Sequence, residues 1–390
     1  MQRTILIENI NVFMEDAAIK SGNVLLENSI IKKITTEQIK IPSSSTVRKI
    51  NGEGYHLIPG FIDTHIHGVD GADVMDGTET GMDTIANSLP REGTTSFLAT
   101  TMTQSKKVIE NALSNLAVYD NKDGQSEMIG IHLEGPFINH DKSGAQLSEN
   151  IIPANIGLFT KWQQLAKGKI KTVTLAPECE GMDRFIPFLV ENGLNVSAGH
   201  TNATYEQMKE AVDLGVRQVT HVCNAMSGIH HRDIGAVGAT MKIASLSAEL
   251  IADFIHVSKP MIELLYDQLG SARLMLITDS IKAKHLQPGQ YEFGGNEIFV
   301  DEERALLKDR KTLAGSMLTM EKAVKNMLSL KGIILKDIIQ MASINPAKQA
   351  GIFHRKGSIA IGKDADLLIV DDSINIKFTI CRGVISYEGE

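Results

Sequence analysis

The middle of the chain alternates short apolar runs with longer stretches in which apolar residues recur at helical spacing. Eight of the short runs have the length of strands, at residues 56–66, 94–102, 127–134, 170–177, 195–200, 218–223, 246–256 and 273–279. Amphipathic stretches between them include residues 106–119, 185–193, 204–215 and 260–270. Eight strands with helices between them, spread over about 290 residues, predict a (β/α)8 barrel. A doubly wound open sheet is the alternative, but no G-x-G-x-x-G motif follows the first strand.

The two ends of the chain have a different pattern, with short β-rich runs and turn residues. TILIENINVF and GNVLLENSIIKKI lie near the start, and SIAIGKDADLLIVDDS and FTICRGVISY lie near the end. Because neither end is long enough for a core of its own, we expect residues 1–56 and 352–390 to form one small β-sandwich domain. Residues 57–351 are then the barrel domain, with a β insertion at residues 290–307.

Composition and charge narrow the class of protein. The 390 residues are 43% hydrophobic and 22% charged, as in soluble globular proteins, and carry a formal net charge of -8. The negative charge argues against nucleic acid as a partner. No apolar run is long enough for a membrane span, and MQRTILIENI lacks the features of a signal peptide. We therefore expect a cytoplasmic protein whose three cysteines are free thiols.

Ionisable side chains collect where the expected strands end. Seven residues share this position: His65, His67, Glu134, His200, His221, His256 and Asp279. The carboxyl ends of barrel strands form a single face, which is where enzymes of this fold carry their active sites. The seven side chains are therefore predicted to meet in one cavity.

The residue types at these positions suit a divalent metal ion. His65 and His67 are two residues apart, so both imidazoles point to the same side of the strand. Imidazoles and carboxylates such as Glu134 are ligands for zinc or iron. Asp279 is placed to move a proton between water and a leaving group. Cys223 is either a soft ligand or, more in keeping with its oxygen- and nitrogen-rich surroundings, a buried inert thiol.

Several motifs resemble those of the amidohydrolase superfamily and, within it, the N-acetylglucosamine-6-phosphate deacetylases. PGFIDTHIHG and GKDADLLIVD are typical of the superfamily, whereas HLEGPF followed by GAQ, THVCNAM and the later Arg232 are specific to the deacetylases. The resemblance extends from about Ile5 to Ile385. It implies hydrolysis of N-acetyl-D-glucosamine 6-phosphate to D-glucosamine 6-phosphate and acetate by metal-bound hydroxide, in amino-sugar catabolism and recycling.

The resemblance also implies roles for individual residues. Glu134, His200 and His221 would be the primary metal ligands, and Asp279 the catalytic acid and base that also touches the metal. His65 and His67 would support a second ion, so that one or two zinc or iron ions are expected per subunit. The superfamily's carboxylated lysine on the fourth strand has no counterpart here, since that strand ends in Ala-Pro-Glu at residues 176–178.

Substrate contacts implied by the resemblance come from several loops: Ala145, Gln146, Asn224, Ala225, Arg232, His256, Leu313, Ala314 and Gly315. Gln146 departs from family members that have histidine at this position. An arginine suits a phosphate because it donates two parallel hydrogen bonds. In family dimers this arginine reaches the neighbouring subunit's site, so a homodimer with Arg232 in that role is expected.

Two other classes of function remain open from the sequence. Another amidohydrolase reaction, on a cyclic amide or a base, would use the same barrel and metals without a phosphate pocket. A catalytically silent barrel that serves as a scaffold is less consistent with a full set of ionisable residues.

Overall fold

The computed structural model describes residues 3–41 and 47–389. Eight strands of the middle region form one sheet in which every neighbouring pair is parallel. They are β6 (Phe61–Ile66), β9 (Thr94–Thr101), β10 (Glu127–Glu134), β11 (Ile170–Leu175), β12 (Asn195–Ala198), β13 (Gln218–Val219), β14 (Ser247–Ile251) and β15 (Leu274–Ile277). The backbone N–H of Asp279, just after β15, donates to the carbonyl of His65 on β6 at 2.8 Å, so the last strand meets the first. The predicted (β/α)8 barrel is confirmed.

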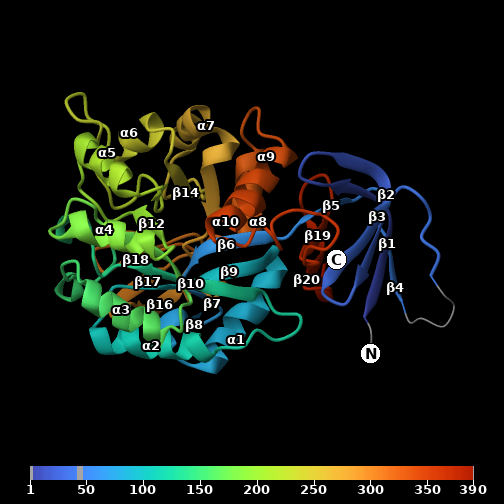
Figure 1. The fold of residues 1–390 in the computed structure, drawn as a ribbon, viewed down its shortest axis with the longest axis horizontal. Helices are drawn as coiled ribbons and strands as arrows, with labels where there is room; N and C mark the ends of the chain where they lie inside the picture. Colours follow the sequence, from blue (N-terminus) through green and yellow to red (C-terminus); the bar gives the residue numbers. More distant parts are fainter. Residues whose placement is uncertain (1–2, 42–46, 390) are drawn as a thin grey trace.

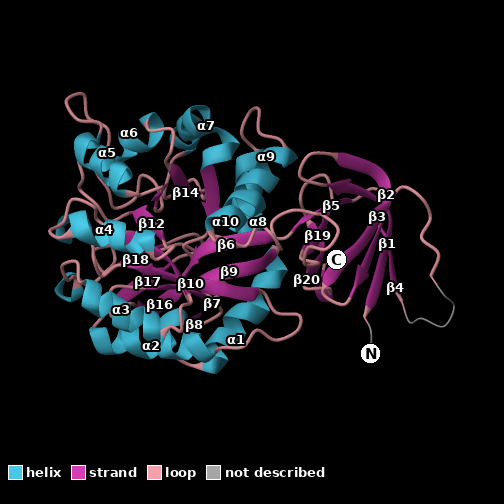
Figure 2. Cartoon of the chain, in the orientation of Figure 1, coloured by secondary structure: helices cyan, strands magenta, loops and turns pink. Residues whose placement is uncertain are grey.

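Helices surround this barrel, as Figures 1 and 2 show. They are α1 (Glu79–Ser88), α2 (Lys106–Val118), α3 (Ile156–Leu165), α4 (Met182–Glu191), α5 (Tyr205–Leu214), α6 (Gly235–Lys242), α7 (Lys259–Arg273) and α8 (Met320–Leu328), followed by α9 (Leu335–Ile339) and α10 (Asn345–Gln349). Their sequences are amphipathic: α8 buries Met320, Ala323, Val324 and Met327, which lie on one helical face. The strands beneath are buried on both sides, as is usual for parallel sheets covered by helices.

The two ends of the chain form the second domain, where the blue and red parts of the ribbon meet (Figure 1). Its strands are β1 (Thr4–Phe13), β2 (Ala18–Glu27), β3 (Ile30–Thr35), β4 (Arg48–Asn51), β5 (His56–Pro59), β19 (Leu367–Val370), β20 (Ile376–Cys381) and β21 (Val384–Glu388). They form one continuous sheet, in which β4 and β5 pair with successive parts of the same edge of β1. This sheet has a separate hydrophobic core that includes Ile7, Val24, Leu57 and Ile369.

The chain passes from the terminal sheet to the barrel at Gly60. β5 pairs with β19 in the terminal sheet, and β6 begins the barrel immediately afterwards. A Cβ atom on Gly60 would lie 2.2 Å from the Thr95 hydroxyl, so only glycine fits here. The domain limits at residues 57–351 stay a prediction. Residues 1–2, 42–46 and 390, which belong to the expected terminal domain, lie outside the described residues.

The expected β insertion is present after β15. It is an antiparallel sheet of β16 (Gly289–Phe293), β17 (Asn296–Val300) and β18 (Ala305–Leu307). The side chain of Asn296 donates to the carbonyl of Ala145 at 2.9 Å, and Gln104 donates to the carbonyl of Gly294 at 2.5 Å. The insertion is therefore fixed against the loops on the catalytic face of the barrel.

None of the helices in residues 3–41 and 47–389 combines the length and the hydropathy needed to cross a membrane.

Candidate active site

Ionisable side chains from five strands meet at the carboxyl end of the barrel. Glu134 is the last residue of β10, and His65 lies one residue before the end of β6. His200, His221 and Asp279 each follow two residues after a strand, namely β12, β13 and β15. A cavity of about 360 Å³ lies over them. As the sequence predicted, its walls include His67, Glu134, His200, His221, His256 and Asp279, while His65 lies just beneath.

The backbone turns sharply at three of these residues. His200, His221 and Asp279 have φ angles of 48°, 30° and 49°, in the left-handed region that residues other than glycine rarely occupy. Such strain is typical of functional sites, where the surrounding structure holds it in place. In each case the strand ends at this turn, and the side chain of the residue at the turn faces the cavity.

Glu134 lies between two groups of side chains. One of its carboxylate oxygens is 3.2 Å from Nε2 of His200 and 3.1 Å from Nε2 of His221. The same carboxylate is 3.4 Å from Nε2 of His65 and 3.5 Å from Nε2 of His67.

The second group is completed by Asp279. Its carboxylate lies 3.2 Å from Nε2 of His67 and 3.5 Å from Nε2 of His65. Glu134 therefore touches both groups, as a bridging ligand would.

The imidazoles are held in the orientation that metal ligation requires. Nδ1 of His67 lies 3.1 Å from the carbonyl of Thr100, and Nδ1 of His200 lies 2.7 Å from the carbonyl of Lys142. A carbonyl only accepts, so in both rings Nδ1 carries the proton and Nε2 presents a lone pair to the cavity. Nε2 of His65 is buried without any hydrogen-bond partner and points between the two carboxylates. Ring nitrogens that present lone pairs to the cavity in this way are suited to bind a divalent cation.

The pKa shifts of the buried groups also favour a bound cation. Burial acts to raise the pKa of Glu134, but His65, His200 and His221 hold that pKa well below its ordinary value. Burial acts to lower the pKa of His65, but Glu134, Asp279 and Glu249 outweigh it and raise that pKa well above its ordinary value. The carboxylates therefore favour positive charge at the centre of the site, which a bound cation would supply.

Most of the expected substrate contacts line the same cavity. They are Ala145, Gln146, Asn224, Ala225, His256, Leu313 and Gly315. Ala314 is buried behind this wall. Gln146 donates to Glu134 at 2.9 Å and accepts from the backbone N–H of Thr103 at 2.9 Å, so its amide nitrogen faces the candidate metal ligands.

Arg232 is not brought into this cavity by its own chain. It is exposed, pairs with His231 at 2.9 Å and lines a separate depression together with Tyr205 and Lys242. Any role for Arg232 in a phosphate site must therefore be played in another copy of the chain or after a movement.

Two further side chains, His132 and Cys223, lie beside the site without joining it. Both nitrogens of His132 are already used, with Nδ1 3.2 Å from the carbonyl of Thr64 and Nε2 2.7 Å from the hydroxyl of Thr174. His132 is therefore a buried, hydrogen-bonded residue with no free ring nitrogen. Burial raises the pKa of the Cys223 thiol to about 12, so it stays protonated, and the three cysteines are free.

Sequence reasoning missed several residues around the cavity. Lys142, Lys311, Phe293 and Glu249 lie in or directly beneath the cavity. Lys311 stands next to the TLAGS motif, and Glu249 is a carboxylate inside an otherwise apolar strand, so both had a sequence signal. Phe293 had none, because nothing in the sequence shows where the β insertion folds.

Comparisons with known proteins agree with this geometry. Residues 56–385 match the amidohydrolase family. The chain is 42% identical to N-acetylglucosamine-6-phosphate deacetylase from Bacillus subtilis, over 99% of this chain and 98% of that protein. It is 34% identical to N-acetylgalactosamine-6-phosphate deacetylase from Escherichia coli O157:H7, over 89% and 90%.

Solved structures are similar along the whole chain. The structure of N-acetylglucosamine-6-phosphate deacetylase from Thermotoga maritima matches with a TM-score of 0.87 and 31% identity, over 98% of this chain and 100% of that one. An aspartate-to-alanine mutant of the Mycobacterium smegmatis enzyme, in complex with N-acetyl-D-glucosamine-6-phosphate, matches with a TM-score of 0.87 and 26% identity, over 99% of both chains.

Proposed function

The chain belongs to the amidohydrolase family, among its N-acetylglucosamine-6-phosphate deacetylases, and from this premise we propose its reaction in detail. It hydrolyses the acetamide of N-acetyl-D-glucosamine 6-phosphate and releases D-glucosamine 6-phosphate and acetate. The observation that carries the proposal is the position of Glu134, within 3.5 Å of four imidazoles in one cavity.

These residues would hold one or two zinc or iron ions. Glu134, His200 and His221 would form the primary set, and His65, His67 and Asp279 the second, with Glu134 shared. A bound ion supplies Lewis acidity, which polarises an amide carbonyl and makes water more acidic. The donor set is equally suited to zinc and iron.

Asp279 is the group that moves the proton. Its carboxylate is 12% exposed, against 4% for Glu134, so it reaches the cavity while Glu134 lies deeper. Asp279 accepts a proton from water as the water oxygen bonds to the acetyl carbon. It then gives that proton to the sugar nitrogen as the carbon–nitrogen bond breaks, which leaves acetate and the free amine.

The other cavity residues position the sugar. Gln146 donates a hydrogen bond but does not titrate, so it orients groups without exchanging protons. His256, held by Asp253 at 2.6 Å, and the backbone around Asn224 and Leu313 face the space left for the phosphosugar. In a homodimer, Arg232 of one subunit binds the phosphate in the cavity of the other subunit. Its exposed position outside its own cavity supports this arrangement.

An Asp279→Asn variant tests the proposal. Asparagine keeps the size but accepts no proton, so we expect turnover per bound metal ion to fall by about 10²–10⁴-fold. Acetate release is measured with N-acetylglucosamine 6-phosphate, beside an Asp183→Asn control on the exposed side of α4. Full turnover of metal-loaded Asp279→Asn would remove Asp279 from this role.

A further inference from the structure

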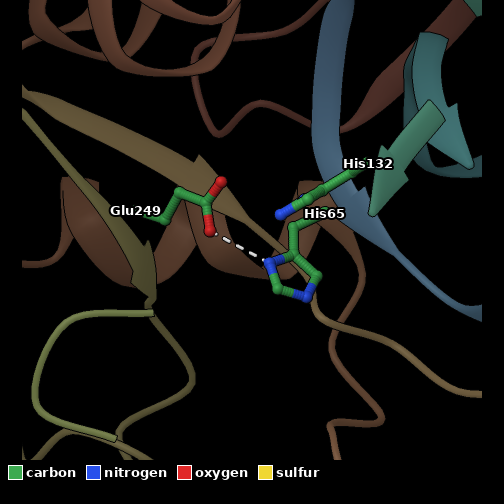
Figure 3. Close-up of side chains that lie close together, drawn as sticks. All are labelled: His65, His132 and Glu249. Atoms are coloured by element: carbon green, nitrogen blue, oxygen red, sulfur yellow. Dashed lines mark hydrogen bonds and ion pairs between the residues drawn. The ribbon is translucent and has the colours of Figure 1, made fainter. Parts of the chain in front are cut away.

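A buried carboxylate lies directly beneath the candidate metal site. Glu249 comes from β14 and is fully buried, outside the walls of the cavity. Its Oε2 lies 2.9 Å from Nδ1 of His65, and Figure 3 shows this contact as the dashed line. Its Oε1 accepts from the side chain of Gln218 at 2.6 Å. The proton transfer at Asp279 does not involve this carboxylate.

Glu249, His65 and His132 lie close enough together to suggest a metal site of their own. The hydrogen bonds argue against this. Both nitrogens of His132 and both carboxylate oxygens of Glu249 already have partners. Glu249 therefore acts on its neighbours, and not on an ion of its own.

The contact with His65 fixes how that ring can bind a metal. A carboxylate only accepts hydrogen bonds, so Nδ1 of His65 donates its proton to Glu249, and Nε2 is left as the ring atom that a metal ion would bind. This Nε2 is the buried atom without a hydrogen-bond partner that points between Glu134 and Asp279. A carboxylate on the outer nitrogen also makes an imidazole a stronger ligand.

Glu249 reaches the other ligand group as well. Its Oε2 accepts from the backbone N–H of His221 at 3.4 Å. His221 is the most strained of the three turns, with φ at 30°, and needs such support. One carboxylate thus touches a member of each group.

We propose that Glu249 is a positioning residue that holds His65 and His221 in the geometry that binds metal. The inference rests on the metal-dependent function proposed above. Glu249 touches neither substrate nor the reacting atoms, and its effect passes through the two histidines.

Glu249→Gln is the direct test. The amide has nearly the same size but cannot accept from both His65 and Gln218, so one donor loses its acceptor. Loss of an outer hydrogen-bond partner typically weakens metal affinity about 10–100-fold, and we expect that loss here. Metal-free protein is titrated with Zn²⁺ against a chelator, and bound metal per chain is counted by mass spectrometry.

Glu127→Gln is the matched control. It also removes a largely buried carboxylate, at the opposite end of β10, where Glu127 pairs with Arg355 and Lys356. We expect it to lower stability and leave zinc affinity at the wild-type value. If Glu249→Gln binds zinc as tightly and in the same ratio as the wild type, the inference is wrong. If the wild type itself binds no metal, the proposed function fails first, so the two failures are distinct.

A measurement on the wild-type zinc form covers the case in which Glu249→Gln does not fold. Nitrogen-15 NMR of labelled histidines reports which ring nitrogen carries the proton, and a His65→Asn variant assigns the signal. We expect a proton on Nδ1 of His65 that is hydrogen-bonded and slow to exchange. A proton on Nε2 of His65 would overturn the inference.

Discussion

Glu134 is the residue that contacts both groups of candidate metal ligands. It is 3% exposed and lies against four imidazoles at the ends of three strands, β6, β12 and β13. Because a neutral amide in its place cannot balance a cation or bridge two of them, Glu134→Gln is expected to weaken zinc binding by more than about 100-fold, beyond the loss typical of an outer partner. Equilibrium zinc titration checks this, with circular dichroism to show that the variant folds. Wild-type affinity in a folded Glu134→Gln protein would contradict a ligand role.

The direction of a side chain was predictable from the sequence where its spacing along a strand alone determines it. His65 and His67 are such a pair, because residues two apart on a strand face the same way. The left-handed turns at His200 and His221 were not predictable, since they depend on neighbouring strands that lie far away in the sequence. Glu249 had a signal as a carboxylate inside an apolar strand, but its role was not predictable, because its partner His65 lies 184 residues away in the sequence.

At the scale of elements, the alternation of strands and helices predicted the barrel correctly. The eight apolar runs all contain strands, although β13 is only Gln218–Val219. Its brevity follows from the turn at His221, which the apolar pattern of QVTHVC does not reveal. The β insertion was predicted as an element, but its position over the cavity was not.

The β insertion supplies an apolar wall to the cavity. Phe293, on β16, packs edge-on against His67 with ring centroids 5.7 Å apart, and Met102 lies beside it. We predict that this apolar wall, next to the candidate metal ligands, limits the size of the acyl group. One methylene in such a pocket changes specificity about 10–200-fold.

Phe293→Ala is therefore expected to raise the ratio of kcat/KM for an N-propionyl over an N-acetyl substrate by about 10-fold or more. Steady-state kinetics with the two acyl phosphosugars measure the ratio. Phe299→Ala is the control, since Phe299 is on the same insertion but packs under Arg310. An unchanged ratio in Phe293→Ala would show that the wall does not face the acyl group.

At the scale of the whole molecule, buried ion pairs join the barrel to the C-terminal segment. Glu127, at the start of β10, binds Arg355 at 2.7 Å and Lys356 at 2.8 Å. Lys356 also binds Asp366, next to β19 of the terminal sheet. Burial acts to raise the pKa of Glu127, but Arg355 and Lys356 outweigh it and lower that pKa from 4.5 to about 2.

A lowered pKa in the folded state means that ionised Glu127 stabilises the fold above pH 4.5, and that this stability is lost as the pH falls towards 2. Glu127→Gln is expected to lower the free energy of unfolding by about 3 kcal/mol at pH 7 and by only about 1 kcal/mol at pH 3. Urea denaturation at the two pH values measures both. A deficit that is equal at both pH values would contradict the account.

The position of Arg232 predicts cooperation between two chains. Chains with Arg232→Ala and chains with Asp279→Asn should each have low activity. In a mixed dimer, one cavity combines an intact Asp279 with an intact Arg232 from the partner. The mixed dimer, obtained by co-expression and purification, is therefore expected to be more active than either variant alone. Equal activity of the mixed dimer and the single variants would show that Arg232 acts within its own chain.

The central claim is that this barrel deacetylates a phosphorylated amino sugar, and acetate release from two substrates tests it most directly. The zinc- or iron-loaded enzyme is given N-acetylglucosamine 6-phosphate and unphosphorylated N-acetylglucosamine. Two or more charge-assisted hydrogen bonds to phosphate, each contributing about 1.5–3 kcal/mol, predict a kcat/KM at least about 100-fold higher for the phosphorylated sugar. Equal values for the two sugars would contradict the claim.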